Sequence, residues 1–150
     1  MSKKAAVATT PESVSVFKEQ LATYKEVIDT DIASYVVSLQ SQTAEQFGDN
    51  SKRAVNAYTE ILSRGGKRIR GALSMLAYTT FGGNDEEVAI TAARAIEMVQ
   101  AYLLITDDIA DRSASRRGGP SAHELLKSWH KKNHLKDDSK HFGESIAMNA

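Results

Sequence analysis

Carboxylates and guanidinium groups lie close together in the stretch DDIADRSASRRGGP. On a helix, Asp107 and Asp111 stack on one face because they are four residues apart, with Asp108 displaced beside them. Three carboxylates this close repel one another and oppose the dipole at a helix C-terminus unless a cation lies among them. Magnesium suits such oxygen ligands and keeps part of its shell for water and phosphates. The motif predicts a Mg²⁺-diphosphate site, and a solvated acidic helix end is the alternative that it leaves open.

Arginines follow the aspartates in a loop that two glycines and a proline shape. Arg112, Arg116 and Arg117 supply planar guanidinium groups, which match phosphate oxygens in pairs of hydrogen bonds. Their position directly after the aspartates favours diphosphate binding over a merely solvated helix end.

A second basic segment, GGKRIRG, lies upstream of the aspartates. Lys67 and Arg70 are expected three residues apart on one helix face, just after two glycines, and a helix N-terminus with two cations is suited to an anion. The spacing is not that of the P-loop, so we do not expect nucleotide binding by that route. The alternative is an exposed basic turn formed by Lys67, Arg68 and Arg70.

The elements that position these residues are expected to be helices throughout, because no segment alternates apolar and polar residues over the length of a strand. Turn residues and apolar spacing predict a long first helix, which starts at Pro11 with Thr10 as its cap and ends near Gly48, and a second helix from Ser51 to Gly65. A third helix is expected to end at Gly82, and a fourth to begin at Asn84 or Asp85. A short helix from Ala122 to Trp129, a polar loop over 131–138 and a last helix that begins near His141 are expected to follow.

Apolar residues recur at spacings of three and four and define the expected core. The candidates are Phe17, Leu21, Tyr24, Ile28, Ile32, Tyr35 and Leu39 in the first helix, Val55, Tyr58, Ile61 and Leu62 in the second, Leu73, Met75, Leu76 and Phe81 in the third, and Val88, Ile90, Ala92, Ala93, Ile96, Val99, Leu103 and Leu104 in the fourth. The fourth helix is apolar on more than one side, which predicts a central position.

Composition narrows the function classes. The 150 residues hold 19 Lys and Arg against 19 Asp and Glu, so no net field attracts nucleic acid or an anionic membrane. There is no cysteine for a disulfide or a thiolate metal site. No apolar run reaches the length of a membrane span, and we expect a cytoplasmic protein with a flexible polar leader over 1–11.

Four motifs in order resemble those of the trans-isoprenyl diphosphate synthases, or polyprenyl synthetases. GGKRIR comes first, Gln100 lies seven residues before Asp107, DDIAD follows, and RRGGPSAH begins nine residues after Asp107. The resemblance runs from about Ala54 to the end. It implies an all-α, isoprenoid synthase-type antiparallel helical bundle, apparently truncated, with residues 12–150 forming the N-terminal half of the synthase domain.

The resemblance also implies site residues. Asp107, Asp108 and Asp111 would hold Mg²⁺ and, with Arg116, the diphosphate of an allylic substrate. The diphosphate of isopentenyl diphosphate would bind four residues: Lys67, Arg70, Gln100 and Arg117. Tyr102 and Leu103, just before the aspartates, would help to set product length, and their types are similar to those of synthases that make C15 to C20 products.

The expected function is a prenyltransferase that condenses an allylic diphosphate with isopentenyl diphosphate, as a homodimer that associates through helices. Family members carry a second aspartate-rich motif, and here the segment from Asp137 to His141 places a histidine where the last aspartate would be needed. The chain alone is therefore expected to be inactive.

Two other functions stay open on the sequence. One is a non-catalytic helical partner subunit of a prenyl synthase, although the retained aspartates argue against it. The other is a zinc-binding module that uses His130 and His134, which are four residues apart but lack a third ligand at a suitable spacing. His123, which follows the arginine loop, and Trp129 are expected to have structural roles.

Overall fold

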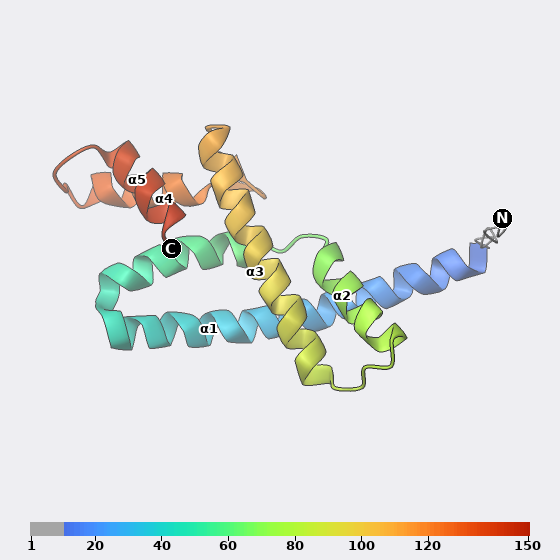
Figure 1. The fold of residues 1–150 in the computed structure, drawn as a ribbon. Helices are drawn as coiled ribbons and strands as arrows, with labels where there is room; N and C mark the ends of the chain where they lie inside the picture. Colours follow the sequence, from blue (N-terminus) through green and yellow to red (C-terminus); the bar gives the residue numbers. More distant parts are fainter. Residues whose placement is uncertain (1–10) are drawn as a thin grey trace, which may run out of the picture.

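The computed structural model describes residues 11–150, so the predicted leader and the cap Thr10 lie outside the described residues. The elements, in chain order, are α1 (Pro11–Ser63), α2 (Ile69–Thr80), α3 (Glu86–Ala110), β1 (Ser115–Arg116), β2 (Gly119–Pro120), α4 (Ala122–Lys132) and α5 (Ser139–Met148). Figure 1 shows α3 crossing the other helices near the middle of the bundle. The all-helical fold class is confirmed, with one small addition at β1 and β2.

Helix α1 folds back on itself at Gly48, so its two arms run side by side in opposite directions (Figure 1). Gly48 has φ 78° and ψ 178°, a conformation that an L side chain rarely adopts. The predicted break at this glycine is confirmed. Ser51, however, does not cap the second arm, because its hydroxyl donates to the carbonyl of Phe47, on the other side of the break.

The core lies where both arms of α1 meet α2 and α3. Its most deeply buried large apolar side chains are Ile28, Ile32, Ile61, Leu62 and Ile105. Helix α3 starts as predicted, because the carboxylate of Asp85 accepts a hydrogen bond from the amide of Val88. Several predicted core residues are instead exposed: Phe17, Leu73, Phe81, Val88, Val99 and Leu103.

Helices α4 and α5 pack on each other beside the second arm of α1. Trp129 packs against Phe142, with ring centroids 5.9 Å apart, and the guanidinium of Arg53 lies over its indole. Asp138 caps α5, and backbone hydrogen bonds from His141 and Lys140 lower the pKa of its carboxyl. The structural roles predicted for Trp129 and the buried His123 fit these positions.

The zinc-site hypothesis for His130 and His134 is wrong in this structure. His130 is buried, and its Nε2 lies 2.9 Å from the carbonyl oxygen of Lys136, within the α4–α5 loop. His134 is exposed beyond the end of α4. Within residues 11–150, no three histidine or acidic side chains form a group that could hold a metal ion.

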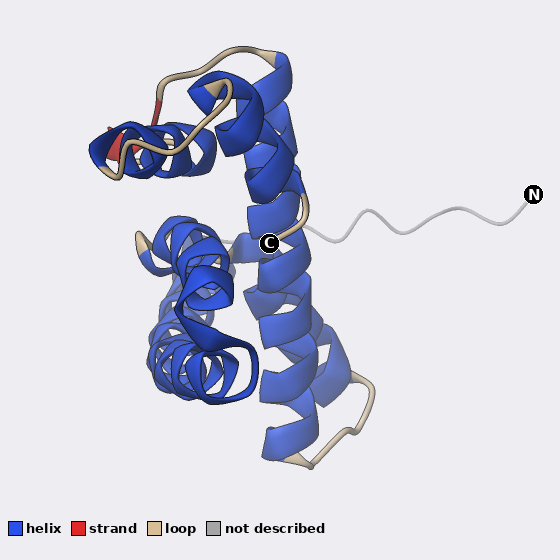
Figure 2. Ribbon diagram, turned by 90° about the vertical axis from the view of Figure 1, so that its left-hand side faces the viewer, coloured by secondary structure: helices blue, strands red, loops and turns tan. Residues whose placement is uncertain are grey.

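Strands β1 and β2 form a two-residue antiparallel hairpin that the sequence did not predict (Figure 2). Its two turn residues, Arg117 and Gly118, both have positive φ, 50° and 78°. Two consecutive positive φ angles are the requirement of a tight type I′ hairpin turn. The arginine loop is therefore a defined hairpin rather than an irregular connection.

Helix α3 is, among residues 11–150, the one helix with the length and composition to cross a membrane, which the sequence prediction did not anticipate. It packs against α1 and α2 and buries the carboxylate of Glu97 against Arg68. These contacts are those of a helix in a bundle, although only 28% of its most apolar window is buried among the described residues.

The guanidinium of Arg68 joins three helices at the centre of the bundle. Its Nε donates to Asp29 of α1 at 2.8 Å, its Nη1 to Glu97 of α3 at 3.4 Å, and its Nη2 to the carbonyl of Leu62 at 2.8 Å. Glu97 also accepts from the amide of Gly71 in α2, at 3.0 Å. Burial raises the pKa of Asp29, but hydrogen bonds from Lys25 and Arg68 outweigh this effect, so the pKa is lowered overall. Every charge in this group has a partner.

We expect Glu97→Gln to lower the free energy of unfolding by about 3 kcal/mol, because it leaves the buried Arg68 with an incomplete set of partners. Asp31→Asn is the matched control, since Asp31 and Arg94 form a pair that is more exposed than Arg68 and Glu97, with 23% and 22% of their side chains exposed, and this substitution should cost less than about 1 kcal/mol. Urea unfolding followed by circular dichroism measures both. Equal losses in the two variants would contradict the central role of Arg68.

The burial of the Tyr58 hydroxyl leads us to expect a loss of stability at high pH. Burial, with a smaller effect of Tyr35, raises the pKa of Tyr58 to about 12, and its hydroxyl donates to the carbonyl of Met98 at 2.7 Å. Because the folded-state pKa is the higher one, this contribution is complete below about pH 10 and is lost as the pH rises through about 12. We expect a fall of about 2 kcal/mol in the free energy of unfolding across that window. Urea unfolding should show a shallower fall in Tyr58→Phe, and parallel pH profiles would refute the assignment.

Candidate functional site

A cavity of about 330 Å³ opens between the start of α2, the middle of α3 and the hairpin. Its lining residues are Lys67, Arg68, Ile69, Arg70, Glu97, Gln100, Leu104, Arg116 and Arg117. The four residues predicted to hold one diphosphate, Lys67, Arg70, Gln100 and Arg117, are therefore brought together with Arg116. Their roles in binding stay predictions.

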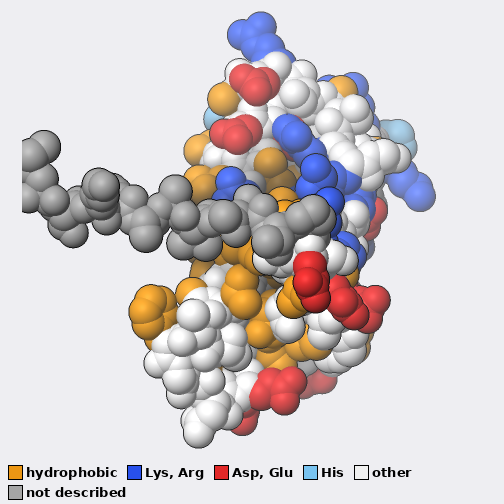
Figure 3. All heavy atoms as spheres, turned by 90° about the vertical axis from the view of Figure 1, so that its right-hand side faces the viewer, with side chains coloured by type: hydrophobic (Ala, Val, Ile, Leu, Met, Phe, Trp, Pro, Cys, Tyr) orange, Lys and Arg blue, Asp and Glu red, His pale blue; other side chains and the backbone are white. Residues whose placement is uncertain are grey.

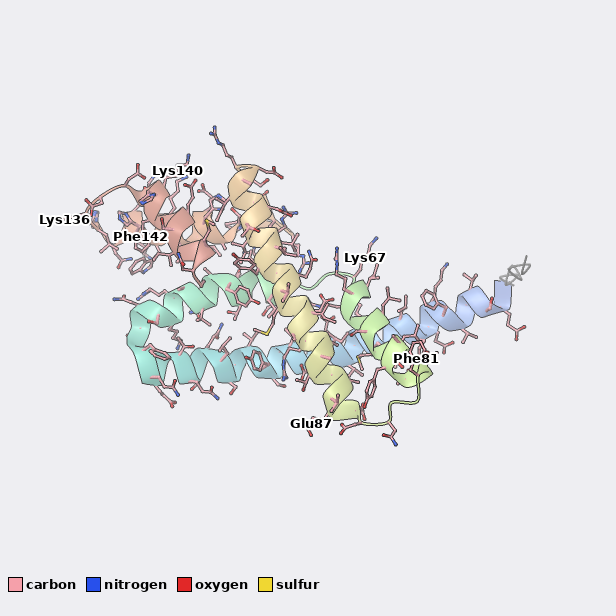
Figure 4. All side chains as sticks on the ribbon, viewed as in Figure 1. Lys67, Phe81, Glu87, Lys136, Lys140 and Phe142 are labelled. Carbon is pink, nitrogen blue, oxygen red and sulfur yellow. The ribbon has the colours of Figure 1, made fainter. Side chains whose placement is uncertain are left out.

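The GGKRIRG segment divides its basic residues between two tasks. Arg68 is 4% exposed and has a left-handed backbone conformation, with φ 49°, directly before α2 begins at Ile69. Lys67 and Arg70 are exposed, and Lys67 projects from the connecting loop (Figure 4). The predicted shared helix face is thus wrong for Lys67, which precedes the helix. The alternative of a uniformly exposed basic turn is wrong for Arg68.

The N-terminus of α2 is not an entirely free set of amides. The amide of Gly71, in the first turn, already donates to the carboxylate of Glu97. An anion beside this turn would therefore be held chiefly by the side chains of Lys67 and Arg70, and less by the helix amides than the sequence suggested.

Arg117 ties the hairpin to the end of α1. Its guanidinium donates to the carbonyls of Ile61 and Gly65, and a Cβ at Gly66 would lie 2.9 Å from its Nη2. Burial lowers the pKa of Arg117, and repulsion from the nearby Arg68 lowers it further. The two basic segments, far apart in the sequence, are thus in direct contact.

Arg116 lies against Asp108 at the end of α3. The Nε of Arg116 donates to both carboxylate oxygens of Asp108, at 2.9 and 3.1 Å, and Nη2 makes a further contact. The Asp108 side chain is fully buried. The hydrogen bond to Asp108 raises the pKa of Arg116, with added attraction from Asp107 and Asp111.

Asp107 and Asp111 are exposed at the same helix end, and neither forms an ion pair with another described residue. In this structure Asp108 is engaged with Arg116, and residues 11–150 hold no group of three histidine or acidic side chains that could hold a metal ion. The predicted binding of Mg²⁺ by Asp107, Asp108 and Asp111 stays a prediction. The pair Asp107 and Asp111 still fits Mg²⁺, which commonly takes one or two protein carboxylates and completes its shell with water and phosphate.

The cations of the cavity differ in their partners. Arg68 and Arg116 each meet a carboxylate, whereas Lys67, Arg70 and Arg117 form no ion pair with any of the residues that the structure describes. On the face seen in Figure 3, Lys and Arg side chains gather in the upper half, with a few acidic side chains among them. Three uncompensated cations around one cavity favour a multiply charged anion over a neutral ligand.

Tyr102 and Leu103, predicted to set product length, lie on an exposed face of α3, with 43% and 47% of their surfaces exposed. Within the part of the chain that the structure describes, no wall faces them to close a pocket. Their predicted role is untested by this structure.

Sequence reasoning missed two residues of the site. Glu97 is the one acid in a mainly apolar stretch of α3, and that isolation is a signal for a buried, paired carboxylate. Arg64 contacts the hairpin from the end of α1, and no spacing in the sequence pointed to it.

Comparison with known proteins agrees with these features. Residues 51–150 match the family described as polyprenyl synthetase. A short chain isoprenyl diphosphate synthase of Methanocaldococcus jannaschii is 36% identical over 96 residues, which are 64% of this chain and 25% of that protein. A farnesyl diphosphate synthase of Geobacillus stearothermophilus is 34% identical over 104 residues, 68% of this chain and 32% of that protein. The chain thus spans about a quarter to a third of these relatives.

A solved structure supports the same relationship. The crystal structure of a geranylgeranyl pyrophosphate synthase from Corynebacterium glutamicum, in complex with isoprenyl diphosphate and magnesium, superposes with a TM-score of 0.75 and 30% sequence identity. The match covers 86% of this chain and 37% of that one.

Proposed function

The chain belongs to the polyprenyl synthetase family, and from this we propose that it forms the part of a trans-prenyltransferase that binds two diphosphates. The observation that carries the proposal is the cavity at which Lys67, Arg70 and Arg117 meet without carboxylate partners among the described residues. The aspartates at the end of α3 lie beside it through the Arg116–Asp108 pair.

The cationic side supplies the site for isopentenyl diphosphate in this proposal. Lys67 and Arg70 approach from the start of α2, Arg117 from the hairpin turn and Gln100 from α3. Charge-assisted hydrogen bonds from these groups hold the diphosphate and orient the attached double bond. Because Arg117 is anchored on carbonyls of α1, it needs little reordering to bind.

The acidic side receives the allylic diphosphate. Asp107 and Asp111 would hold Mg²⁺, which supplies positive charge to the leaving diphosphate when bound. Asp108 has a different part: it fixes the guanidinium of Arg116 at the same helix end. Arg116 then contacts the allylic diphosphate from a preset position.

The reaction proposed is condensation of the two substrates. The allylic carbon–oxygen bond breaks toward a carbocation, the double bond of isopentenyl diphosphate attacks that carbon, and a proton is lost. The residues of this chain contribute by positioning and by electrostatic stabilisation of the departing diphosphate. Products of C15 to C20 remain our proposal from Tyr102 and Leu103, as do a cytoplasmic location and a homodimer. The 150 residues contain no second aspartate-rich motif, so we propose binding without turnover by this chain alone.

Calorimetric titration of the chain with geranyl diphosphate, with and without Mg²⁺, tests the acidic side. We expect Mg²⁺ to strengthen binding, and Asp107→Asn to weaken the Mg²⁺-dependent affinity at least about tenfold, since one charged contact is lost. Glu87→Gln is the matched control, an exposed acid at the opposite end of the same helix (Figure 4). It should bind as the unmodified chain does.

Isopentenyl diphosphate titrated without metal tests the cationic side separately. Arg70→Gln should weaken this ligand by about tenfold, while Asp107→Asn should leave it within about twofold. A folded chain that binds neither ligand would refute the proposal and favour the non-catalytic partner subunit.

A further inference from the structure

Arg64 is the first residue beyond α1, and its side chain reaches across to the hairpin. Nη1 donates to the carbonyl of Arg116 at 3.0 Å and to the carbonyl of Pro120 at 2.6 Å. Nη2 donates to the carboxylate of Glu60 at 3.0 Å, one turn back in α1. The Arg64 side chain is 14% exposed. Its guanidinium is therefore engaged on both sides within the protein.

The two carbonyls that Arg64 binds lie on opposite strands of the hairpin. Arg116 belongs to β1 and Pro120 to β2, and the ladder between the strands is only two residues long. A two-stranded ladder of this length is not stable by itself in water. Arg64 thus joins the strands to each other and to the end of α1.

Arg64 approaches the hairpin backbone closely at Gly119, which has no side chain. A Cβ at this position would lie 2.6 Å from Cζ of Arg64, and the other two nearest atoms are also of that guanidinium. Gly119 is not among the residues with positive φ. A side chain at position 119 would therefore clash with the Arg64 guanidinium, whereas the backbone conformation would allow it.

We propose that Arg64 is a positioning residue for the diphosphate site. It fixes the hairpin so that the Arg116 side chain meets Asp108 and the Arg117 side chain meets the cavity. It does not line that cavity, and both of its terminal nitrogens already donate within the protein, so it acts through the two arginines. The inference rests on the proposed function, because it assigns the hairpin arginines to diphosphate.

Without Arg64, both hairpin arginines keep their side chains but lose a fixed backbone. Binding would then have to order the hairpin, which weakens affinity without removing any contact to the ligand. Two measurements detect the loss of hairpin order and its effect on binding separately. One is the exchange rate of the Ser121 amide, which donates to the carbonyl of Ala114 at 3.1 Å, at the open end of the hairpin. The other is the affinity for inorganic pyrophosphate.

The first experiment compares Arg64→Gln with the unmodified chain, using hydrogen exchange by NMR and calorimetric titration with pyrophosphate. We expect Ser121 exchange to accelerate, and pyrophosphate binding to weaken, each by about tenfold. Arg53→Gln is the control, since Arg53 lies on the same arm of α1 but stacks on Trp129, and it should change neither. Arg64→Lys keeps the charge but loses the fork; we expect it to resemble Arg64→Gln, whereas full rescue would overturn the proposal in favour of a general charge effect.

The second experiment is a double-mutant cycle with Gly119→Ala. Alone, this substitution should displace the Arg64 guanidinium and reproduce the loss of pyrophosphate affinity. In the Arg64→Gln background, Gly119→Ala should weaken pyrophosphate affinity by less than about a further twofold, since the guanidinium that its methyl group would displace is absent. Additive losses would contradict the proposed contact.

The outcomes separate this inference from the function on which it rests. If the unmodified chain binds no pyrophosphate, the proposed function fails, and with it the link from Arg64 to diphosphate. If the chain binds but Arg64→Gln leaves affinity unchanged, the positioning role alone is overturned, even where Ser121 exchange accelerates.

Discussion

The buried guanidinium of Arg68 is the contact on which the rest of the structure depends. It meets Asp29 of α1 and Glu97 of α3 from the residue that immediately precedes α2, so three helices share one charge group. Removing charges from water is costly, and only a full set of partners offsets that cost. Arg68 has a left-handed backbone conformation at this position, and the neighbouring Lys67 is exposed beside the cavity.

The arginines of the site differ in function because they differ in partners. Arg64 and Arg68 use their donors on protein carbonyls and carboxylates, which places segments of the chain. Arg117 donates to the carbonyls of Ile61 and Gly65 and has no carboxylate partner among the described residues, so its charge stays uncompensated beside the cavity. A chain with zero net charge thereby concentrates positive charge at one place.

Periodicity and turn residues were sufficient to predict the helices, the break at Gly48 and a cap at Asn84 or Asp85, of which the structure has Asp85. They were insufficient to predict which side chains pair with one another. The pattern GGKRIRG does not say which cation is buried, since that depends on Glu97, 29 residues beyond Arg68. The hairpin was missed because two-residue strands have no period, and Arg117 gives no sign of a positive φ. Val99 and Leu103 were assigned to the core because they are apolar, yet their neighbours in the described chain do not cover them.

The Arg116–Asp108 pair explains how an unfavourable helix end is tolerated. Three carboxylates at the C-terminus of α3 repel one another and oppose its dipole. Arg116 neutralises the buried member, and the attraction of Asp107 and Asp111 acts on the same guanidinium. Asp108 is thereby withdrawn from the surface, and two exposed carboxylates remain one turn apart, which is the number that Mg²⁺ commonly takes from protein. The same ion pair that stabilises the helix end therefore also separates the aspartates, since it buries Asp108 against Arg116 and leaves Asp107 and Asp111 exposed.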